Sequence, residues 1–138
     1  MHASAVLYRG LGLLIRGPSG SGKSRLAEAL IRRGGTLVAD DRVFVAARAG
    51  RLLACAPRAI AGLLELRGRG LVARPVERQV VLALVLDIVA KWERMPPVED
   101  FSICLMQIEL ARQPVPPHPD IALPLVEAAL DRIEESRN

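Results

Sequence analysis

The 138-residue sequence has few aromatic side chains: one Trp, one Tyr and two Phe. Modules that bind RNA or single-stranded DNA stack bases on aromatic side chains, so this scarcity argues against a nucleic-acid partner. Hydrophobic residues still make up 51% of the chain, which is enough for a core of Leu, Val, Ile and Ala. We therefore expect one domain over residues 1–138.

Long apolar runs and paired cysteines are also lacking. The longest apolar run, Val80 to Leu86, ends at Asp87 and is far shorter than the roughly 20 residues of a membrane span. Cys55 and Cys104 lie far apart, there is no CxxC pair, and no signal peptide precedes them. We expect a soluble, cytoplasmic protein with free thiols and no membrane partner.

Lysine is scarce as well. Lys23 and Lys91 are the only lysines, so the formal net charge of +4 comes almost wholly from arginines. The planar guanidinium suits phosphates and carboxylates, but a merely arginine-rich surface explains the composition equally well. The charge therefore does not decide between classes of function.

Hydrophobic periodicity and glycine positions predict an α/β domain with a mixed sheet. Strands are expected over residues 4–8, 11–16, 36–39, 43–47, 52–56, 80–89 and 101–110. Helical spacing follows Gly22 as far as Gly34, a short helix is expected over 57–64, and 65–70 reads as a glycine-rich loop. Residues 114–120, PVPPHPD, predict a rigid linker. A terminal helix follows, with an apolar face made of Leu123, Val126, Leu130 and Ile133.

Residues 17–24, GPSGSGKS, match the P-loop motif GxxxxGK[ST] in full, between an apolar strand and a helical pattern. Glycines in such a loop let backbone N–H groups surround phosphate oxygens, and the helix N-terminus adds its positive end. Lys23 would bridge the outer phosphates, and Ser24 would place its hydroxyl on Mg²⁺. We expect the nucleotide to bind along Gly17, Pro18, Ser19, Gly20, Ser21, Gly22, Lys23 and Ser24.

A P-loop does not identify the reaction. The sole asparagine is Asn138, so the Asn-Lys-x-Asp motif by which GTPases recognise guanine is absent from the sequence. ABC and AAA-type motors need a far longer chain. A small kinase or phosphotransferase, or a nucleotide-binding switch without chemistry, remains.

Two aspartates, Asp40 and Asp41, follow the strand after the P-loop helix. An acidic group there can reach a metal ion held by Ser24. Adjacent strand residues point to opposite sides, so both can face the site only if the chain turns there. A plain turn signal would look the same, but the P-loop upstream favours a site.

Residues 2–43, followed by LLELRGRG at 63–70, resemble the catalytic domain of bacterial HPr kinase/phosphorylase, in the short form of some proteobacteria. That family combines a P-loop, an ADD strand end and a Glu-Arg-Gly signature loop in this order. The resemblance covers about half of the chain. It implies an α/β fold related to phosphoenolpyruvate carboxykinase, and a hexamer. It also implies phosphorylation of a serine of HPr by ATP or pyrophosphate, and removal of that phosphate by inorganic phosphate.

The resemblance assigns roles to individual residues. His2 takes the place of a histidine near the transferred phosphate, although a frayed terminus is the alternative. Of the paired aspartates, one is implied as the acid/base and the other as a metal partner; position favours Asp40 as the acid/base and Asp41 for the metal. Glu65 would complete the Mg²⁺ environment. Arg67 would neutralise the moving phosphoryl group, with a surface ion pair between these two as the alternative.

The sequence also departs from the family. Members usually carry a longer loop after the signature, which ends in an arginine that covers the phosphate. Arg74 and Arg78 are the candidates here, and Arg78 is the better one because it directly precedes the next strand. By comparison with the family, we expect the amino-terminal domain to be missing and the carboxyl-terminal part that helps to dock HPr to be reduced to one helix.

The sequence thus predicts a Mg²⁺-dependent protein-serine kinase that uses ATP, or pyrophosphate. Its substrate would be HPr or an HPr-like phosphocarrier of a phosphotransferase system, and phosphorylase activity is a further expectation. A non-catalytic nucleotide sensor and a small-molecule P-loop kinase are the alternatives.

Overall fold

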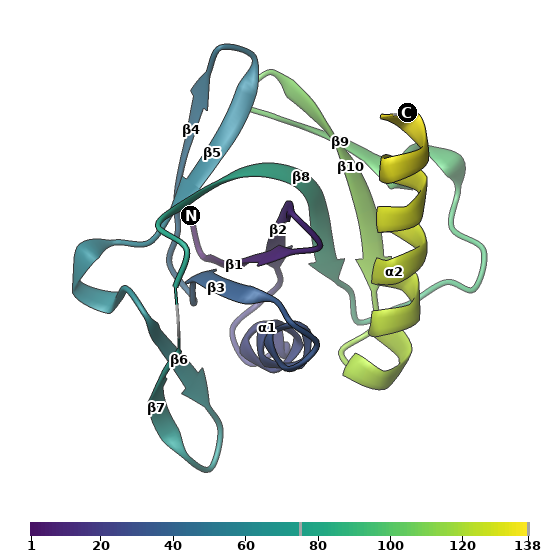
Figure 1. Ribbon diagram of the computed structural model, residues 1–138. Coiled ribbons are helices and arrows are strands. Elements are labelled where there is room, and N and C mark those ends of the chain that lie inside the picture. Colours follow the sequence, from purple (N-terminus) through teal and green to yellow (C-terminus); the bar gives the residue numbers. More distant parts are fainter. Residues whose placement is uncertain (75, 138) are drawn as a thin grey trace.

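A mixed β-sheet forms the centre of the computed structural model, which describes residues 1–74 and 76–137 (Figure 1). The helices are α1 (Lys23–Arg32) and α2 (Pro119–Ser136), with single 3-10 turns η1 (Arg58–Ile60) and η2 (Val98–Phe101). The strands are β1 (Ala3–Tyr8), β2 (Leu11–Arg16), β3 (Thr36–Ala39), β4 (Phe44–Arg48), β5 (Arg51–Cys55), β6 (Leu63–Leu66), β7 (Gly70–Ala73), β8 (Gln79–Ile88), β9 (Ser102–Leu105) and β10 (Ile108–Val115). The expected mixed α/β fold is confirmed.

Three neighbouring strands, β2, β8 and β10, run parallel in a sheet ordered β3-β1-β2-β8-β10-β9. β1 pairs antiparallel with β2 and β3, β9 with β10, and β5 joins β4 to the start of β8. The carboxyl ends of parallel strands meet at one edge, where α/β proteins place their ligands. Arg16 at the end of β2 lies opposite Asp87 of β8 in this register.

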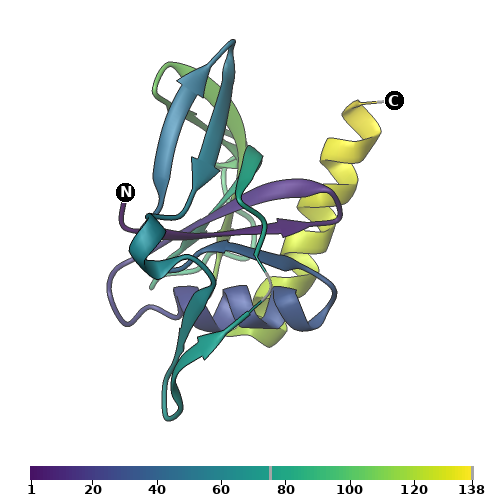
Figure 2. The same ribbon diagram turned by 60° about the vertical axis from the view of Figure 1, so that its left-hand side comes forward.

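Both helices cover the same face of the sheet. α1 contributes Leu26 and Leu30, and α2 contributes Val126 and Leu130, to one buried cluster with β1, β2 and β8. The opposite face buries a second cluster with β3 and β5. In two views the hairpins β4–β5 and β6–β7 project from the sheet in opposite directions (Figures 1 and 2).

The segment after β5 differs from the helix expected over 57–64. Only the single turn η1 forms there, before β6 begins. Pro57 precedes this turn and Gly62, with φ +81°, follows it, so the chain reverses after one turn. The glycine-rich loop expected over 65–70 accordingly narrows to the tight turn between β6 and β7.

The single strand expected over 101–110 is instead a hairpin. β9 and β10 are joined by Met106 and Gln107, whose φ values are +49° and +66°. Two left-handed residues are the geometry of a two-residue hairpin turn, which Asn or Gly usually marks. Neither Asn nor Gly occupies this turn, so the sequence pattern does not indicate it.

The rigid linker expected over 114–120 is largely regular structure. Pro114 pairs with Asp87 at the end of β10, and α2 starts at Pro119. Pairing between β9 and β10 stops at Ala111, so the outer edge of β10 is unpaired at Pro114 among the described residues. A proline is tolerated at such an edge because no ladder hydrogen bond is lost.

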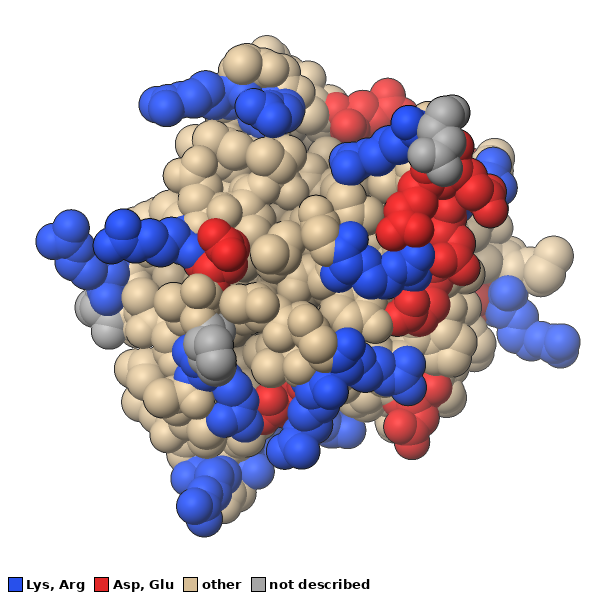
Figure 3. Space-filling model, in the orientation of Figure 1, with Lys and Arg blue, Asp and Glu red and all other residues tan. Residues whose placement is uncertain are grey.

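Ion pairs, as well as its apolar face, hold helix α2 against the rest of the domain. Arg9, in the turn between β1 and β2, forms ion pairs with Glu127, Asp131 and Glu134. Figure 3 shows acidic side chains gathered on this side and basic ones scattered over the remaining surface in view. In residues 1–74 and 76–137 no helix is both long and apolar enough to cross a bilayer.

Candidate active site

The P-loop joins β2 to α1, and its glycines are required by geometry. Gly22 has φ +105°, a backbone angle that residues other than glycine rarely adopt. A Cβ at Gly17 would lie 2.5 Å from Ser21 Oγ and 3.2 Å from Ile88 Cβ, so a side chain there would require the Ser21 side chain to move. Gly22 is also the N-cap of α1 and makes no side-chain cap, so the first amides of the helix can bind an anion.

Lys23 folds back over this loop. Its side chain leaves the residue only 5% exposed, and Nζ donates to the carbonyl oxygens of Gly17 (2.8 Å) and Pro18 (3.1 Å). A buried ammonium group needs such partners. The lysine charge is therefore held at the mouth of the loop, where the outer phosphates of a bound polyphosphate would lie.

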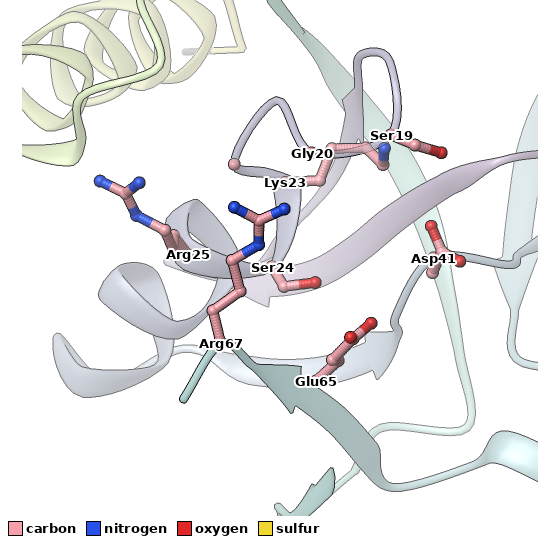
Figure 4. A pocket seen from close by; sticks show the side chains of 9 residues that line it. Ser19, Gly20, Lys23, Ser24, Arg25, Asp41, Glu65 and Arg67 are labelled. Carbon is pink, nitrogen blue, oxygen red and sulfur yellow. The ribbon is translucent and has the colours of Figure 1, made fainter. Parts of the chain in front are cut away.

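A cavity of about 190 Å³ opens beside the loop. Its lining consists of Ser19, Gly20, Gly22, Lys23, Ser24, Arg25, Asp41, Glu65 and Arg67. Figure 4 shows the charges separated: Asp41 and Glu65 lie on one side of Ser24, and Arg25 and Arg67 on the other. The structure thus brings together most of the residues that the sequence indicated, from α1, the end of β3 and β6.

Asp40 is buried and fully engaged. The residue is 6% exposed, and its Oδ1 accepts hydrogen bonds from Ser4 Oγ (2.8 Å) and Ser24 Oγ (2.7 Å). Its Oδ2 accepts the backbone N–H of Glu65 at 2.9 Å. With its oxygens committed in this way, Asp40 orients Ser24 and the β6 hairpin, and it is badly placed to take a proton from a substrate.

Asp41 points instead into the cavity. Its φ of +65° turns the chain at this residue, so Asp41 can face the same site as Asp40 although the two residues are adjacent. The Asp41 side chain is 49% exposed, and Oδ1 lies 3.3 Å from His2 Nε2. The Asp41 carboxylate is therefore accessible from the cavity, whereas that of Asp40 is buried and hydrogen-bonded; the assignment of the acid/base and metal roles to the two aspartates stays a prediction.

His2 belongs to the site and is not a frayed end. The backbone N–H of Val43 donates to the Met1 carbonyl at 3.0 Å, which ties this stretch to the chain beyond the aspartates. The His2 ring lies 3.2 Å from Ser19 Oγ and 3.4 Å from Lys23 Nζ, besides its contact with Asp41. One imidazole therefore links the P-loop to the free carboxylate.

The donor set suits a divalent cation that also binds phosphate. In the described part of the chain, no three His, Cys, Asp or Glu side chains gather in a way that could hold a metal alone. Mg²⁺ rarely needs such a cage, because it keeps water and takes one or two protein oxygens plus phosphate. The Ser24 hydroxyl donates its hydrogen to Asp40, which leaves its lone pairs for a cation, and Glu65 lies in the same cavity.

Two arginines line the other side of the cavity. Arg67, in the turn after β6, has an Nη2 atom 3.6 Å from where a Cβ at Gly20 would lie. Arg25 follows Ser24 on α1, and sequence reasoning missed it, although a helix-start residue beside a P-loop serine was the available signal. Neither guanidinium forms an ion pair with a carboxylate among the described residues, so both can meet an anion.

The two arginines considered for covering the phosphate lie elsewhere. Arg74 forms a bidentate ion pair with Glu28 of α1; these hydrogen bonds lower the pKa of Glu28 and raise that of Arg74. Arg78 precedes β8 at its amino end, whereas the P-loop lies at the carboxyl ends of the parallel strands. Arg78 is therefore not part of this site, because a full strand length separates it from the loop.

A partly buried ion cluster lies where the P-loop begins, and no sequence pattern indicated it. Arg16 donates to Asp87 through Nε (2.8 Å) and Nη2 (2.9 Å), and Arg112 Nε donates to the same carboxylate at 2.6 Å. Burial raises the pKa of Asp87, but the hydrogen bonds from the two arginines outweigh it and lower this pKa overall. The cluster joins β2, β8 and β10 where the P-loop begins.

Comparisons with known proteins found similar sequences and a similar structure. The sequence model of the HPr Serine kinase C-terminal domain matches residues 1–133. HPr kinase/phosphorylase of Clostridium tetani is 43% identical over 88 residues, 64% of this chain and 28% of that protein. The same enzyme of Limosilactobacillus reuteri is 47% identical over 73 residues, 52% of this chain and 23% of that protein. The matches thus span about a quarter of these relatives.

A solved structure is similar over nearly the whole chain. The Hpr(Ser) kinase/phosphatase from Coxiella burnetii superposes with a TM-score of 0.81 and 28% sequence identity. The superposition covers 97% of each chain.

Proposed function

Because the chain belongs to the HPr Serine kinase C-terminal domain family, we propose that it is a protein-serine kinase. It would transfer the γ-phosphoryl group of ATP to a serine of HPr or of an HPr-like phosphocarrier. The observation that carries this proposal is the pairing of Asp41 with His2 at 3.3 Å beside Lys23. A nucleotide sensor needs the P-loop but has no use for a free carboxylate at the outer phosphates.

The chain's own residues would act as follows. The loop amides and Lys23 hold the phosphates, and the carrier's serine hydroxyl approaches from the Asp41 side of the cavity. Asp41 accepts the hydroxyl proton as serine Oγ bonds to the γ-phosphorus and the bond to the bridging oxygen breaks, which yields phosphoserine and ADP. His2 orients Asp41, and Arg67 stabilises charge on the transferred group.

Magnesium and the donor nucleotide complete the proposal. Ser24 and Glu65 would hold Mg²⁺, which supplies charge neutralisation for the β- and γ-phosphate oxygens. Asp40 keeps the Ser24 hydroxyl turned toward the cation through its 2.7 Å hydrogen bond. Pyrophosphate would fit the same loop, since the loop binds phosphates and not the base. Reversal by inorganic phosphate uses the same residues, with Asp41 as the acid.

The partner and the assembly follow from the family. Several relatives are named HPr kinase/phosphorylase, which supports HPr or an HPr-like carrier as the partner. We also propose a homo-oligomer, a hexamer as the family resemblance implies. Large apolar side chains left exposed on the single chain, among them Phe44, Met95 and Val98, support self-association. Sedimentation velocity would test this; a monomer at micromolar concentration contradicts it.

The experiment that tests the kinase uses purified protein, Mg²⁺, γ-labelled ATP and purified HPr or HPr-like carrier. We expect label on a serine of the carrier. Asp41→Asn should abolish transfer, while nucleotide affinity measured by calorimetry stays within about three-fold, because the carboxylate contacts the acceptor and not the phosphates. Nucleotide binding without transfer to any carrier would contradict the proposal and favour the sensor.

A further inference from the structure

We propose that Ser4 is a positioning residue that holds Asp41 in its reactive conformation. This inference rests on the proposed kinase function, in which Asp41 is the acid/base. Ser4 lies on β1, 37 residues before Asp41; it does not line the cavity, and its side-chain hydrogen bonds within the described residues are to the two aspartates. It would act only through the two aspartates.

The Ser4 hydroxyl is completely buried and makes two hydrogen bonds with different directions. Its Oγ donates to Asp40 Oδ1 at 2.8 Å and accepts the backbone N–H of Asp41 at 3.1 Å. A hydroxyl has one hydrogen to donate, so the bond to Asp40 fixes its orientation and leaves a lone pair for Asp41. A single buried atom thus joins the metal side of the site to the acid/base side.

Asp41 needs such a constraint because its backbone is unfavourable. A φ of +65° is disfavoured for residues with a Cβ, though less for Asp than for most. In extended backbone, Asp41 would point away from the side to which Asp40 points. The turn at Asp41, including the hydrogen bond from Arg42 N to Asp40 O at 2.8 Å, brings its carboxylate to His2.

Packing does not explain a serine at this place. The neighbours Ala3 and Ala5 are fully buried without polar atoms, and Val6 belongs to the same apolar cluster as α1. A buried hydroxyl costs free energy unless it is hydrogen-bonded. The hydroxyl of Ser4 is useful only through the partners it has, which are the two aspartates.

The test compares Ser4→Ala with Ser4→Thr, which keeps the hydroxyl. For Ser4→Ala we expect kcat to fall about 10- to 100-fold, the size of effect that misplaced catalytic groups produce. Nucleotide affinity should stay within about three-fold, because Asp40 keeps its bonds to Ser24 and Glu65. Ser4→Thr should restore most of kcat. Val6→Ala is the matched control. It removes more side-chain atoms from a buried position on the same strand, so it should lower the melting temperature and leave kcat unchanged.

An unchanged kcat in Ser4→Ala would overturn the inference, and so would a parallel loss of nucleotide affinity. A folded Ser4→Thr that remains as slow as Ser4→Ala would do the same. Amide hydrogen exchange in the nucleotide-free protein separates this failure from that of the kinase proposal. The Asp41 N–H should exchange at least about ten-fold faster in Ser4→Ala than in wild type or Val6→Ala. Equal exchange rates would overturn the inference even if no carrier is ever phosphorylated.

Discussion

The two ends of the parallel strands β2 and β8 each border a cavity, and the cavities differ in kind. At the carboxyl ends the P-loop lines a cavity of about 190 Å³. At the amino ends a larger one, of about 420 Å³, is lined by the β1–β2 turn, Arg51, Glu77 and Gln79. Both contain arginine and glutamate, and the larger volume lies at the end away from the P-loop, so neither size nor charge identifies the reactive cavity.

The difference lies in the backbone. Left-handed residues line both cavities, Gly10 at the larger one and Gly22 and Asp41 at the smaller one, but only Gly22 begins a helix, α1, and only Asp41 carries a carboxylate at its turn. Such turns aim amide groups and a carboxylate into the same space. The site of an α/β protein therefore follows from strand direction, and the larger cavity at the amino ends should take no part in the reaction.

After Asp41→Asn, the largest effect should come from Lys23. Replacing it by Met removes the one ammonium group at the mouth of the loop, and we expect transfer to fall about 10²- to 10³-fold. Steady-state phosphorylation of the carrier measures this change. Arg51→Met removes a cation from the larger cavity and should leave the rate within about two-fold. Equal losses of rate in both variants would contradict the claim that only the cavity at the carboxyl ends takes part in the reaction.

Substitutions of Asp40 and Asp41 should differ in their effect on the stability of the protein. Asp40→Asn replaces an acceptor-only carboxylate with an amide, which leaves a donor facing the donors of Ser4, Ser24 or Glu65. Burial of such a mismatch should lower the free energy of unfolding by about 1–3 kcal/mol in urea titrations at pH 7. Asp41→Asn should change it by less than about 0.5 kcal/mol, because this side chain is half exposed. A larger loss at Asp41 than at Asp40 contradicts the assignment.

The arginine side of the cavity should act on nucleotide binding. Arg25→Gln and Arg67→Gln each remove a charged donor from the cavity lining. We expect the KM for ATP to rise about ten-fold in each, the equivalent of roughly 1.4 kcal/mol. In Arg67→Gln kcat should fall as well, because Arg67 is proposed to stabilise the transferred group. Arg69→Gln, in the same turn as Arg67 but outside the lining, is the control. A KM unchanged in both cavity variants would exclude this side from binding.

The ion cluster at Asp87 should make stability depend on pH. The pKa of the Asp87 carboxyl group is lower in the folded protein than in the unfolded one. Ionised Asp87 therefore stabilises the fold above the unfolded pKa of about 4. That contribution is lost as the pH falls through the folded pKa. The difference in unfolding free energy between wild type and Asp87→Asn should therefore shrink from pH 7 to pH 3.

The smallest effect should come from Arg78. It stands at the amino end of β8, so Arg78→Ala should leave kcat and KM within about two-fold of wild type. Carrier phosphorylation under saturating and limiting ATP measures both constants. A ten-fold loss of kcat would mean that a residue of the amino end reaches the P-loop after all.

Local patterns predicted much of this structure. The strand over 36–39 has the predicted bounds, and the helix after Gly22 begins where the P-loop motif placed it. These elements are set by residues close to one another in sequence. The hairpin at Met106 and Gln107 was missed because its left-handed turn lacks the glycine or asparagine that marks such turns.

The phosphate loop could be read from residues 17–24 because its glycines, lysine and serine act through their own backbone and nearest neighbours. The division of labour between Asp40 and Asp41 could not, since it depends on Ser4, which lies 37 positions from Asp41. The same holds for Asp87, which meets its arginine partners only when β2, β8 and β10 lie parallel. Local conformation depends on residues that are neighbours in the sequence, whereas burial and hydrogen-bond partners are decided only when distant strands are brought together.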